Sequence, residues 1–410
     1  MTEWSVRPLS ELTENLDAKR IPIKEADRRP GPYPYYGASG IVDYVDDYLF
    51  EGMHLLIAED GENLRTRKLP IAFLADGRFW VNNHAHIVRG NSESDTRFLL
   101  YALLVADVTS YLSGSTMPKL TQGNLNRIPI CAPSKKHQQA IASVLGSLDD
   151  KIELNRRMNE TLEAMARAIF KDWFVDFGPT RAKIEGRAPY LAQDIWSLFP
   201  DRLDDEGKPE GWTTSTIGQE VEVVGGSTPS TKEAAFWGGD ISWATPKDLS
   251  SLSTPVLLST ERQITEAGLA QIGSGLLPVG TVLLSSRAPI GYMAIAQIPV
   301  AVNQGFIAML CKKRLSNVFV WLWTQANMET VHQNANGSTF QEISKANFRP
   351  IEVTIATPEI LRAFDETARP LFDRIVANDR ENRTLATTRD FLLPKLMSGE
   401  VRVGDAASFI

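Results

Sequence analysis

The stretch SLDDKIELNRRMNETLEAMARAIF, residues 147–170, has the pattern of one long amphipathic helix. The stretch PLFDRIVANDRENRTLATTRDFLL, residues 370–393, has the same pattern 223 residues later. In both, apolar residues recur at alternating spacings of four and three, which is the period of a coiled coil. The two stretches therefore predict two long helices that pack against each other.

Two asparagines stand at matching positions of both helices, Asn155 with Asn159 and Asn378 with Asn382. A polar seam residue lowers stability but fixes register, because its amide must find a partner across the interface. The alternative is that each helix packs only on its own domain, but the matched asparagines favour pairing of the helices. The predicted seam comprises Leu148, Ile152, Asn155, Asn159, Leu162, Leu371, Ile375, Asn378, Asn382 and Leu385.

The repeat continues upstream of the helices. Gly114-Ser115-Thr116 recurs as Gly337-Ser338-Thr339 at the same offset, and VNNH at 81–84 is similar to VNQG at 302–305. After each Gly-Ser-Thr triplet comes a short apolar strand pattern and then a helix start. The order of a globular stretch followed by a long helix occurs twice, so the sequence indicates a tandem duplication.

We therefore expect an α+β fold with two mixed α/β globular domains. These are separated by two long helices that pair as an antiparallel coiled coil, with an internal pseudo-twofold repeat. The expected bounds are 1–134 for the first globular domain, 135–177 for the central helical region, 178–208 for a linker, 209–356 for the second globular domain, 357–400 for the C-terminal helical region and 401–410 for a tail.

Composition narrows the class of protein. The net charge of −7 argues mildly against a nonspecific polyanion binder, although it permits a local basic surface. Two cysteines are too few for a disulfide framework or a zinc site. We see no signal peptide and no apolar run long enough to span a membrane, so we expect a cytoplasmic protein.

A duplicated chain of this kind can hold two recognition domains at a fixed separation.

The phrase LDDKIELNRRMNETLEAMARAIFKDWFVDFGPTRAK at 148–183 is followed by LFPD at 198–201 and PEGW at 209–212. This long phrase strongly resembles the central conserved region of type I restriction-modification specificity subunits. The resemblance extends over essentially the whole chain, because that family alternates two target recognition domains with two conserved helical regions.

The resemblance implies a DNA-binding subunit without chemistry of its own. It implies that each globular domain reads one half of a bipartite, asymmetric double-stranded DNA target, and that the coiled coil sets the spacer. The implied partners are two methyltransferase subunits, docked in part by the coiled coil, and two ATP-dependent restriction (translocase-nuclease) subunits. S-adenosylmethionine, ATP and Mg are then expected on the partners and not on this chain.

Catalytic motifs are correspondingly absent from the sequence. It has no Asn-Pro-Pro-aromatic tetrapeptide, GSGLLP at 273–278 has a proline where a cofactor loop needs a small residue, and DDEGKPE at 204–210 is no Walker A loop. His84 and His86 lack the nearby ligand pattern of a metal site. We therefore predict no enzyme activity and no bound metal.

Candidate DNA contacts follow from side-chain chemistry. Phosphate contacts need hydroxyls, lysines and close backbone approach, although the same turn can simply join a strand to a helix. The phosphate candidates are Gly114, Ser115, Thr116, Lys119, Gly337, Ser338, Thr339 and Gln341. Base readout needs polar side chains on rigid loops, although Asn82 or Asn303 can equally cap a turn. The base candidates are Tyr36, Ser39, Glu59, Asp60, Asn82, Asn83, His84, Thr245, Lys247, Asp248, Ser286, Arg287, Asn303 and Gln304.

Two other classes of function compete with DNA recognition. One is a coiled-coil scaffold whose globular domains bind protein partners, and the other is a fused enzyme, which the missing motifs disfavour. Specific, competable binding to duplex DNA separates the first class from DNA recognition, and methyl transfer by this chain alone would favour the second.

Overall fold

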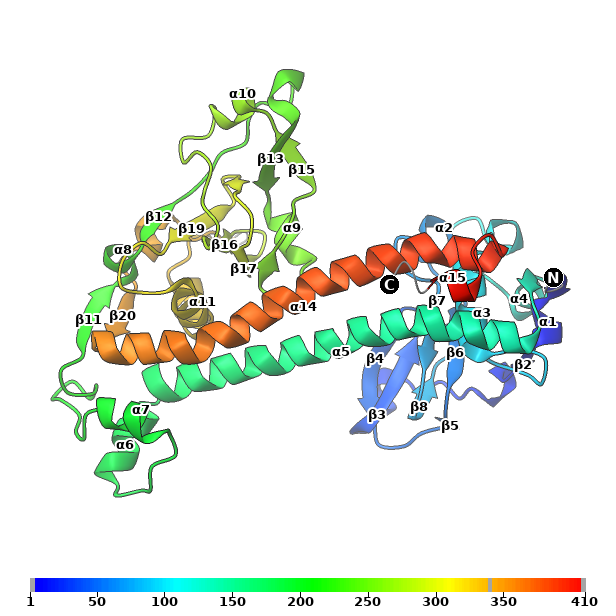
Figure 1. The fold of residues 1–410 in the computed structure, drawn as a ribbon, viewed down its shortest axis with the longest axis horizontal. Helices are drawn as coiled ribbons and strands as arrows, with labels where there is room; N and C mark the ends of the chain where they lie inside the picture. Colours follow the sequence, from blue (N-terminus) through cyan, green and yellow to red (C-terminus); the bar gives the residue numbers. More distant parts are fainter. Residues whose placement is uncertain (1–3, 338–340, 407–410) are drawn as a thin grey trace. The chain divides into compact units, whose positions relative to one another are not determined.

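The computed structural model describes residues 4–337 and 341–406, and the chain divides into two compact units. The first unit combines Met1–Ile152 with Arg383–Ile410, and the second unit is Glu153–Asn382. Two long helices, α5 (Lys135–Phe174) and α14 (Pro358–Ser398), each contribute one part to each unit. Figure 1 colours the chain along the sequence and labels its elements.

The globular domain of the first unit is built on two four-stranded sheets. Every residue of the central strand β6 (His54–Ala58) is buried, which suits its nearly continuous apolar sequence. One sheet has the order β2 (Thr13–Asn15), β9 (Ala85–Gly90), β6 and β7 (Ala72–Ala75). The other has the order β4 (Gly40–Val45), β3 (Pro30–Gly37), β8 (Arg78–Val81) and β5 (Phe50–Glu51), and β1 (Ser5–Pro8) pairs separately with β10 (Pro129–Ala132).

Short helices connect these strands. The longest, α3 (Thr96–Val105), begins at Asp95, whose side chain accepts a hydrogen bond from the Phe98 amide and so caps the helix. The others are α1 (Leu9–Leu12), η1 (Asp17–Lys19), η2 (Glu25–Asp27), α2 (Asn63–Thr66), η3 (Thr109–Tyr111), α4 (Gln122–Asn126) and α15 (Val403–Ala406).

The globular domain of the second unit has the same kinds of sheet. One has the order β12 (Glu222–Val224), β19 (Phe306–Leu310), β16 (Val282–Ser286), β17 (Ile290–Ala296) and β14 (Val256–Leu257). Another has the order β15 (Arg262–Ile264), β13 (Trp237–Ala244) and β18 (Ala301–Val302), and β11 (Thr213–Thr216) pairs with β20 (Glu352–Ile355). The helices are α6 (Gly178–Ile184), α7 (Gln193–Leu198), α8 (Ile217–Glu220), η4 (Ala234–Phe236), α9 (Pro246–Ser250), α10 (Glu266–Leu269), α11 (Asn317–Ala326), α12 (Met328–Gln333) and α13 (Lys345–Phe348).

The two domains repeat one arrangement of strands. The order β2-β9-β6-β7 of the first domain corresponds to β12-β19-β16-β17 of the second. Each second sheet contains one parallel pair, β3 with β8 and β13 with β18, among otherwise antiparallel neighbours. The predicted internal repeat and the mixed α and β content are therefore confirmed.

The long helices run antiparallel and meet through polar and apolar seam residues. In the second unit the Asn378 amide donates a hydrogen bond to Asn159 Oδ1 over 2.8 Å, and the Asn155 amide donates to Asn382 Oδ1 over 3.0 Å. As the residue number rises along α5 it falls along α14, so the pairing is antiparallel, as predicted. The offset of 223 residues converts one hydrogen bond into the other, which gives the seam a local twofold symmetry.

The other seam positions are buried or half-buried. Leu148 and Ile152 are buried on α5, and Ile375 is buried on α14, whereas Leu162, Leu371 and Leu385 are half-buried. Asn155, Asn159 and Asn378 are buried, and Asn382 is half-buried. In the first unit Arg389 of α14 donates to Asp149 of α5 over 2.8 Å, and the positions that correspond to these two at the 223-residue offset are Ala166 and Phe372.

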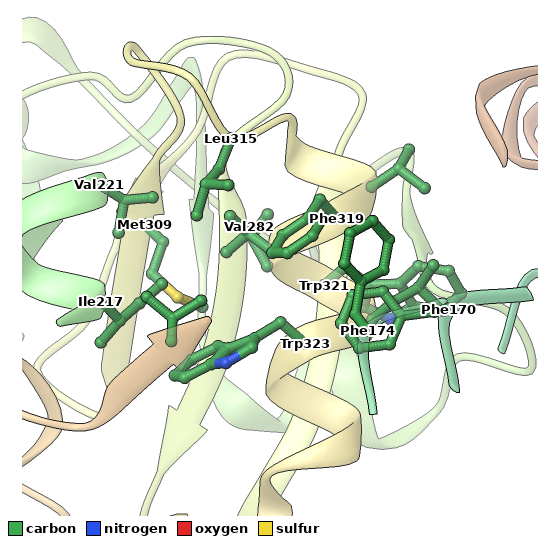
Figure 2. Packing of buried hydrophobic residues seen from close by; sticks show 14 of the residues in the cluster. Phe170, Phe174, Ile217, Val221, Val282, Met309, Leu315, Phe319, Trp321 and Trp323 are labelled. Atoms are coloured by element: carbon green, nitrogen blue, oxygen red, sulfur yellow. The ribbon is translucent and has the colours of Figure 1, made fainter. Parts of the chain in front are cut away.

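Aromatic residues anchor the long helices in the core of the second unit. Figure 2 shows Phe170 and Phe174 of α5 against Phe319 of α11, with ring centroids 5.1 Å and 5.0 Å away from that of Phe319. Phe364 of α14 packs edge-on against Phe174 at 4.9 Å. Such aromatic contacts bury large apolar areas and fix the position of each helix on its domain.

Several sequence expectations needed refinement at loops. The similar stretches VNNH and VNQG mark loops: residues 82–84 join β8 to β9, and residues 303–305 join β18 to β19. The stretch expected as a linker, 178–208, contains α6 and α7, and it buries Trp196 and Phe199. Among the helices that the structure describes, none is long and apolar enough to cross a membrane.

Candidate nucleic-acid interface

Three loops of the first unit converge at one place beside the central sheet. Glu59, which follows β6, donates its amide hydrogen bond to His84 O over 2.9 Å, in the loop between β8 and β9. Leu120 donates its amide to Glu59 O over 2.8 Å. Ser113 and Lys119 exchange backbone hydrogen bonds of 2.8 Å and 2.7 Å, which close the loop between them. Residues 59–60, 82–84 and 113–119, separated in sequence, are therefore neighbours in the fold.

The loop 113–119 has the geometry of a turn that only glycine can begin. Gly114 has a φ of +86°, in the left-handed region, and a Cβ at this position would lie 2.3 Å from Met117 O. Ser115, Thr116 and Met117 are all exposed. The turn thus presents two hydroxyls and exposed backbone to solvent, which is the chemistry that phosphate groups bind.

The second unit builds the same arrangement with different side chains. Ser286, at the end of β16, donates its amide to Gly305 O over 2.8 Å, and Ile343 donates to Ser286 O over 3.0 Å. Asn336 and Glu342 exchange two backbone hydrogen bonds of 2.9 Å, as Ser113 and Lys119 do in the first unit.

The loop that this pair closes begins with Gly337, which has a φ of +96°. Gln341 is exposed, whereas Ser338 and Thr339 lie outside the described residues.

Asn82 and Asn303 form equivalent turns in the two domains. Asn82 Oδ1 accepts a hydrogen bond from the His84 amide over 2.8 Å, and Asn303 Oδ1 accepts one from the Gly305 amide over 2.9 Å. Their own amides bond the ends of the facing strands, at Tyr36 O over 3.0 Å and at Ala244 O over 3.1 Å. Both asparagines shape their loops, and the exposed residues that follow, Asn83 and Gln304, are the ones presented to solvent.

The acidic pair of the first unit faces basic groups of the protein. Glu59 Oε2 accepts a hydrogen bond from Arg20 over 2.9 Å, and Glu59 Oε1 lies 3.2 Å from Lys119 Nζ. Burial opposes ionisation of Glu59, but the hydrogen bond from Arg20, the nearby His86 and Lys119 outweigh it and lower its pKa. Asp60 Oδ2 lies 2.8 Å from His84 Nδ1. The Glu59 carboxylate therefore has both oxygens engaged within the protein.

Two further candidates of the first unit differ in their surroundings. The Tyr36 ring packs against Phe73 and Phe79, with centroids 5.7 Å and 5.6 Å apart, and burial raises the pKa of its hydroxyl. Ser39 is exposed in the turn between β3 and β4. The Tyr36 side chain is thus packed near the end of β3, whereas the Ser39 side chain is exposed.

Of the candidates at the start of α9, Thr245 and Asp248 cap the helix, whereas Lys247 is exposed. The amide and the hydroxyl of Thr245 donate to Asp248 Oδ2 over 2.8 Å and 2.7 Å, so Asp248 completes a capping box. Lys247 is exposed and pairs with Glu261 over 2.7 Å.

The remaining candidates of the second unit lie at the converging loops. Ser286 is buried. The half-exposed Arg287 lies 3.5 Å from Glu342, at the base of the Gly337 loop. Gln304 Oε1 accepts a hydrogen bond from the Thr228 hydroxyl over 2.6 Å.

Arg20 and Thr228 contact the candidate residues Glu59 and Gln304 but were not predicted from the sequence. Arg20 also donates to Ala85 O over 2.7 Å, so it ties the segment before β3 to β9. The signal that could have found them is the tryptophan that begins each half. Arg20 stands at the same distance after Trp4 as Thr228 does after Trp212.

Comparisons with known proteins identify relatives of this chain. The chain is 25% identical over 355 residues to the type I restriction enzyme HindI specificity subunit of Haemophilus influenzae, covering 74% of this chain and 77% of that one. It is 36% identical over 184 residues to the MjaIX specificity subunit of Methanocaldococcus jannaschii, covering 44% and 42%.

A solved structure has the same fold. The S subunit of a type I restriction-modification system from M. genitalium aligns with a TM-score of 0.62 at 16% identity, covering 96% of each chain. The family model described as the type I restriction modification DNA specificity domain matches residues 1–164 and 209–365. The chain therefore belongs to the family of type I restriction-modification DNA specificity subunits.

Proposed function

We propose that this chain, a DNA sequence-recognition subunit by family, reads a bipartite asymmetric target with one half assigned to each globular domain. The observation that carries the proposal is the three-loop arrangement that occurs once in each unit. Equivalent backbone positions carry different side chains in the two domains. Asp60 of the first domain corresponds to Arg287 of the second, and Lys119 corresponds to Glu342. Two readers with one backbone and different side chains are what two unlike half-sites require.

The geometry favours different roles for the candidate residues. Glu59, Asn82, Asp248 and Asn303 are used inside the protein, so we assign them to holding the loops. Exposed or half-exposed side chains remain for the bases, and we favour Ser39, Asn83, His84, Lys247, Arg287 and Gln304. Arginine pairs well with guanine, and glutamine or asparagine pairs well with adenine in the major groove. The Gly114 and Gly337 loops then contact phosphates.

The paired helices serve as the spacer and as part of the platform for other subunits. We propose assembly with two methyltransferase subunits and two restriction (translocase-nuclease) subunits in the cytoplasm. Without a catalytic motif of its own, the chain contributes recognition and no chemistry. S-adenosylmethionine, ATP and Mg belong on the partner subunits in this scheme.

The test uses the assembled methyltransferase complex. Grafting position 39 together with residues 82–84 between chains of known different targets should transfer one half of the specificity and leave the other unchanged. Methylated positions mapped on a random duplex library report the outcome. Transfer of both halves by one graft, or of neither by grafts in both domains, would contradict the assignment of one reader to each domain.

A further inference from the structure

A buried histidine lies beneath the base of the Gly114 loop. His86 of β9 is 1% exposed. Its Nδ1 lies 2.6 Å from Asp17 Oδ2, and its Nε2 lies 2.7 Å from Leu120 O. Leu120 directly follows Lys119, which closes the loop through its backbone pair with Ser113. The imidazole therefore connects the η1 segment to the last residues of the loop.

Both ring nitrogens of His86 face acceptors. The carbonyl of Leu120 can only accept, so Nε2 carries a proton. Asp17 Oδ1 already accepts from the Ile87 amide over 2.9 Å, and Asp17 Oδ2 lies 3.6 Å from Arg20. Burial alone would raise the pKa of Asp17, but the hydrogen bond and charge of His86, the Ile87 amide and Arg20 lower it. Asp17 is thus a carboxylate, and its Oδ2 faces His86 Nδ1 at hydrogen-bond distance.

Two carboxylates and two basic side chains of the first unit lie around this imidazole. Asp17 faces it directly, and Glu59 Oε2 lies 3.9 Å from Nδ1. Arg20 bonds Glu59 from the side of η1, and Lys119 does so from the loop. Burial of the polar imidazole is tolerated because both of its nitrogens have hydrogen-bond partners.

The second unit has no such imidazole at the equivalent position. His86 pairs with Ile57 in the first sheet, and the corresponding pair of the second sheet is Ile307 with Leu284. Ile307 is buried in an apolar core. The hydrogen bonds of His86 to Asp17 and Leu120 therefore occur in the first unit and have no counterpart at this position of the second. The effect of removing them can be separated from DNA binding by the second unit.

We propose that His86 is a positioning residue for DNA binding by the first unit. Held by Asp17, its imidazole fixes Leu120 and so sets the conformation of the Gly114–Lys119 loop, which contacts the phosphates in the proposed function. The proposal rests on the function proposed above. It does not require His86 to touch DNA.

The protonation state can be measured directly on the full chain. The sequence has five histidines, so selective ¹⁵N-histidine labelling gives five ring systems, and the H86Q variant identifies that of His86. Nε2 of His86 should show the shift of a protonated ring nitrogen, because it donates to Leu120 O. A bare Nε2 in the wild-type chain would overturn the proposal, whether or not the variants fold.

The binding test compares two buried histidines of the same unit. His54 is 4% exposed, bonds Gly52 O over 2.9 Å and packs against Phe50 and Phe79, so H54Q removes a buried imidazole elsewhere in the domain. At fixed salt, H86Q should weaken specific binding by the assembled complex about tenfold, whereas H54Q should change it by about twofold or less. Footprinting should show lost protection in one half-site only.

D17N supplies a second variant of similar size. Because it removes the carboxylate that holds the imidazole, its effect should fall in the same half-site as that of H86Q. Equal losses for H86Q and H54Q would make His86 merely structural and overturn the proposal. A wild-type complex without specific DNA binding would instead refute the proposed function, so the two failures are distinguishable.

Discussion

The Asn378 side chain donates a hydrogen bond to Asn159 Oδ1 across the paired helices, over 2.8 Å between two buried amides. Its symmetric counterpart joins Asn155 to Asn382, and Asn155 also donates to Glu381 over 2.7 Å. Sliding one helix by a turn would separate each amide from its partner in an apolar seam. These bonds therefore specify the register of α5 against α14.

A double-mutant cycle at this pair tests that role. Asn378→Leu alone should destabilise the fold by about 1–3 kcal/mol, because it leaves Asn159 Oδ1 buried without a donor. Replacing Asn159 and Asn378 together by leucine should cost less than either single change, since both polar groups leave the seam. Chemical unfolding of the four proteins gives the coupling. Additive losses would show that the two amides do not interact.

Base readout should separate along the chain. Asn83→Ala should lower discrimination in one half of the target, and Gln304→Ala in the other. Each should cost about 1–3 kcal/mol at a single base pair. The measurement is binding of the assembled complex to singly mismatched duplexes. A change in both halves from one substitution would contradict the two-reader model.

Thr228 offers a second test of readout within the second unit. Its hydroxyl orients the Gln304 amide from 2.6 Å without itself being a favoured base reader. Thr228→Val should therefore weaken discrimination at the same base pair as Gln304→Ala, but by a smaller amount.

Lys119 should act on all sequences alike. Its ammonium, half-exposed beside the Gly114 loop, can reach a phosphate, so Lys119→Ala should weaken binding to matched and mismatched duplexes equally. The slope of log affinity against log salt should fall by about one. Lys136→Ala, at an exposed lysine in the first turn of α5, is the matched control. A change confined to one base pair would assign Lys119 to readout instead.

The carboxylate of Asp17 should make the first unit sensitive to acid. Its pKa is lowered in the fold, so its contribution to stability is complete above the ordinary value of 3.8 and is lost as the pH falls through the lower folded value. Unfolding free energies measured across this acidic range should fall more steeply for the wild type than for Asp17→Asn. Parallel curves would mean that Asp17 gains no stabilisation on folding.

Features that repeat along the chain could be predicted from the sequence, whereas contacts between segments distant in sequence could not. The seam follows from a spacing of four and three that is visible in one helix and repeated in the other. The Gly114 and Gly337 turns were visible because the same Gly-Ser-Thr triplet occurs in both halves, and glycine readily adopts a positive φ. Both signals are local, so no knowledge of the tertiary fold was required to read them.

The roles of Arg20, Glu59 and His86 depend instead on contacts between distant segments. Glu59 had the chemistry of a base reader, yet the fold turns its carboxylate toward Arg20 and Lys119. Nothing in the spacing of residues 17–20 shows that they will meet residues 59 and 120. Asn82 and Asn303 could have capped a turn or read a base, and only the geometry shows that their Oδ1 atoms shape the turns.

The Asp149–Arg389 ion pair has a consequence for encounters between separate chains. Because each chain carries two near-copies of one helix, α5 of one molecule could in principle pair with α5 of another. In an antiparallel α5–α5 pair Asp149 would face Ala166, and in an α14–α14 pair Arg389 would face Phe372, so either charge would lose its partner. One charged and one apolar position, exchanged between the copies, thus favour pairing of α5 with α14 over pairing of two like helices from separate chains.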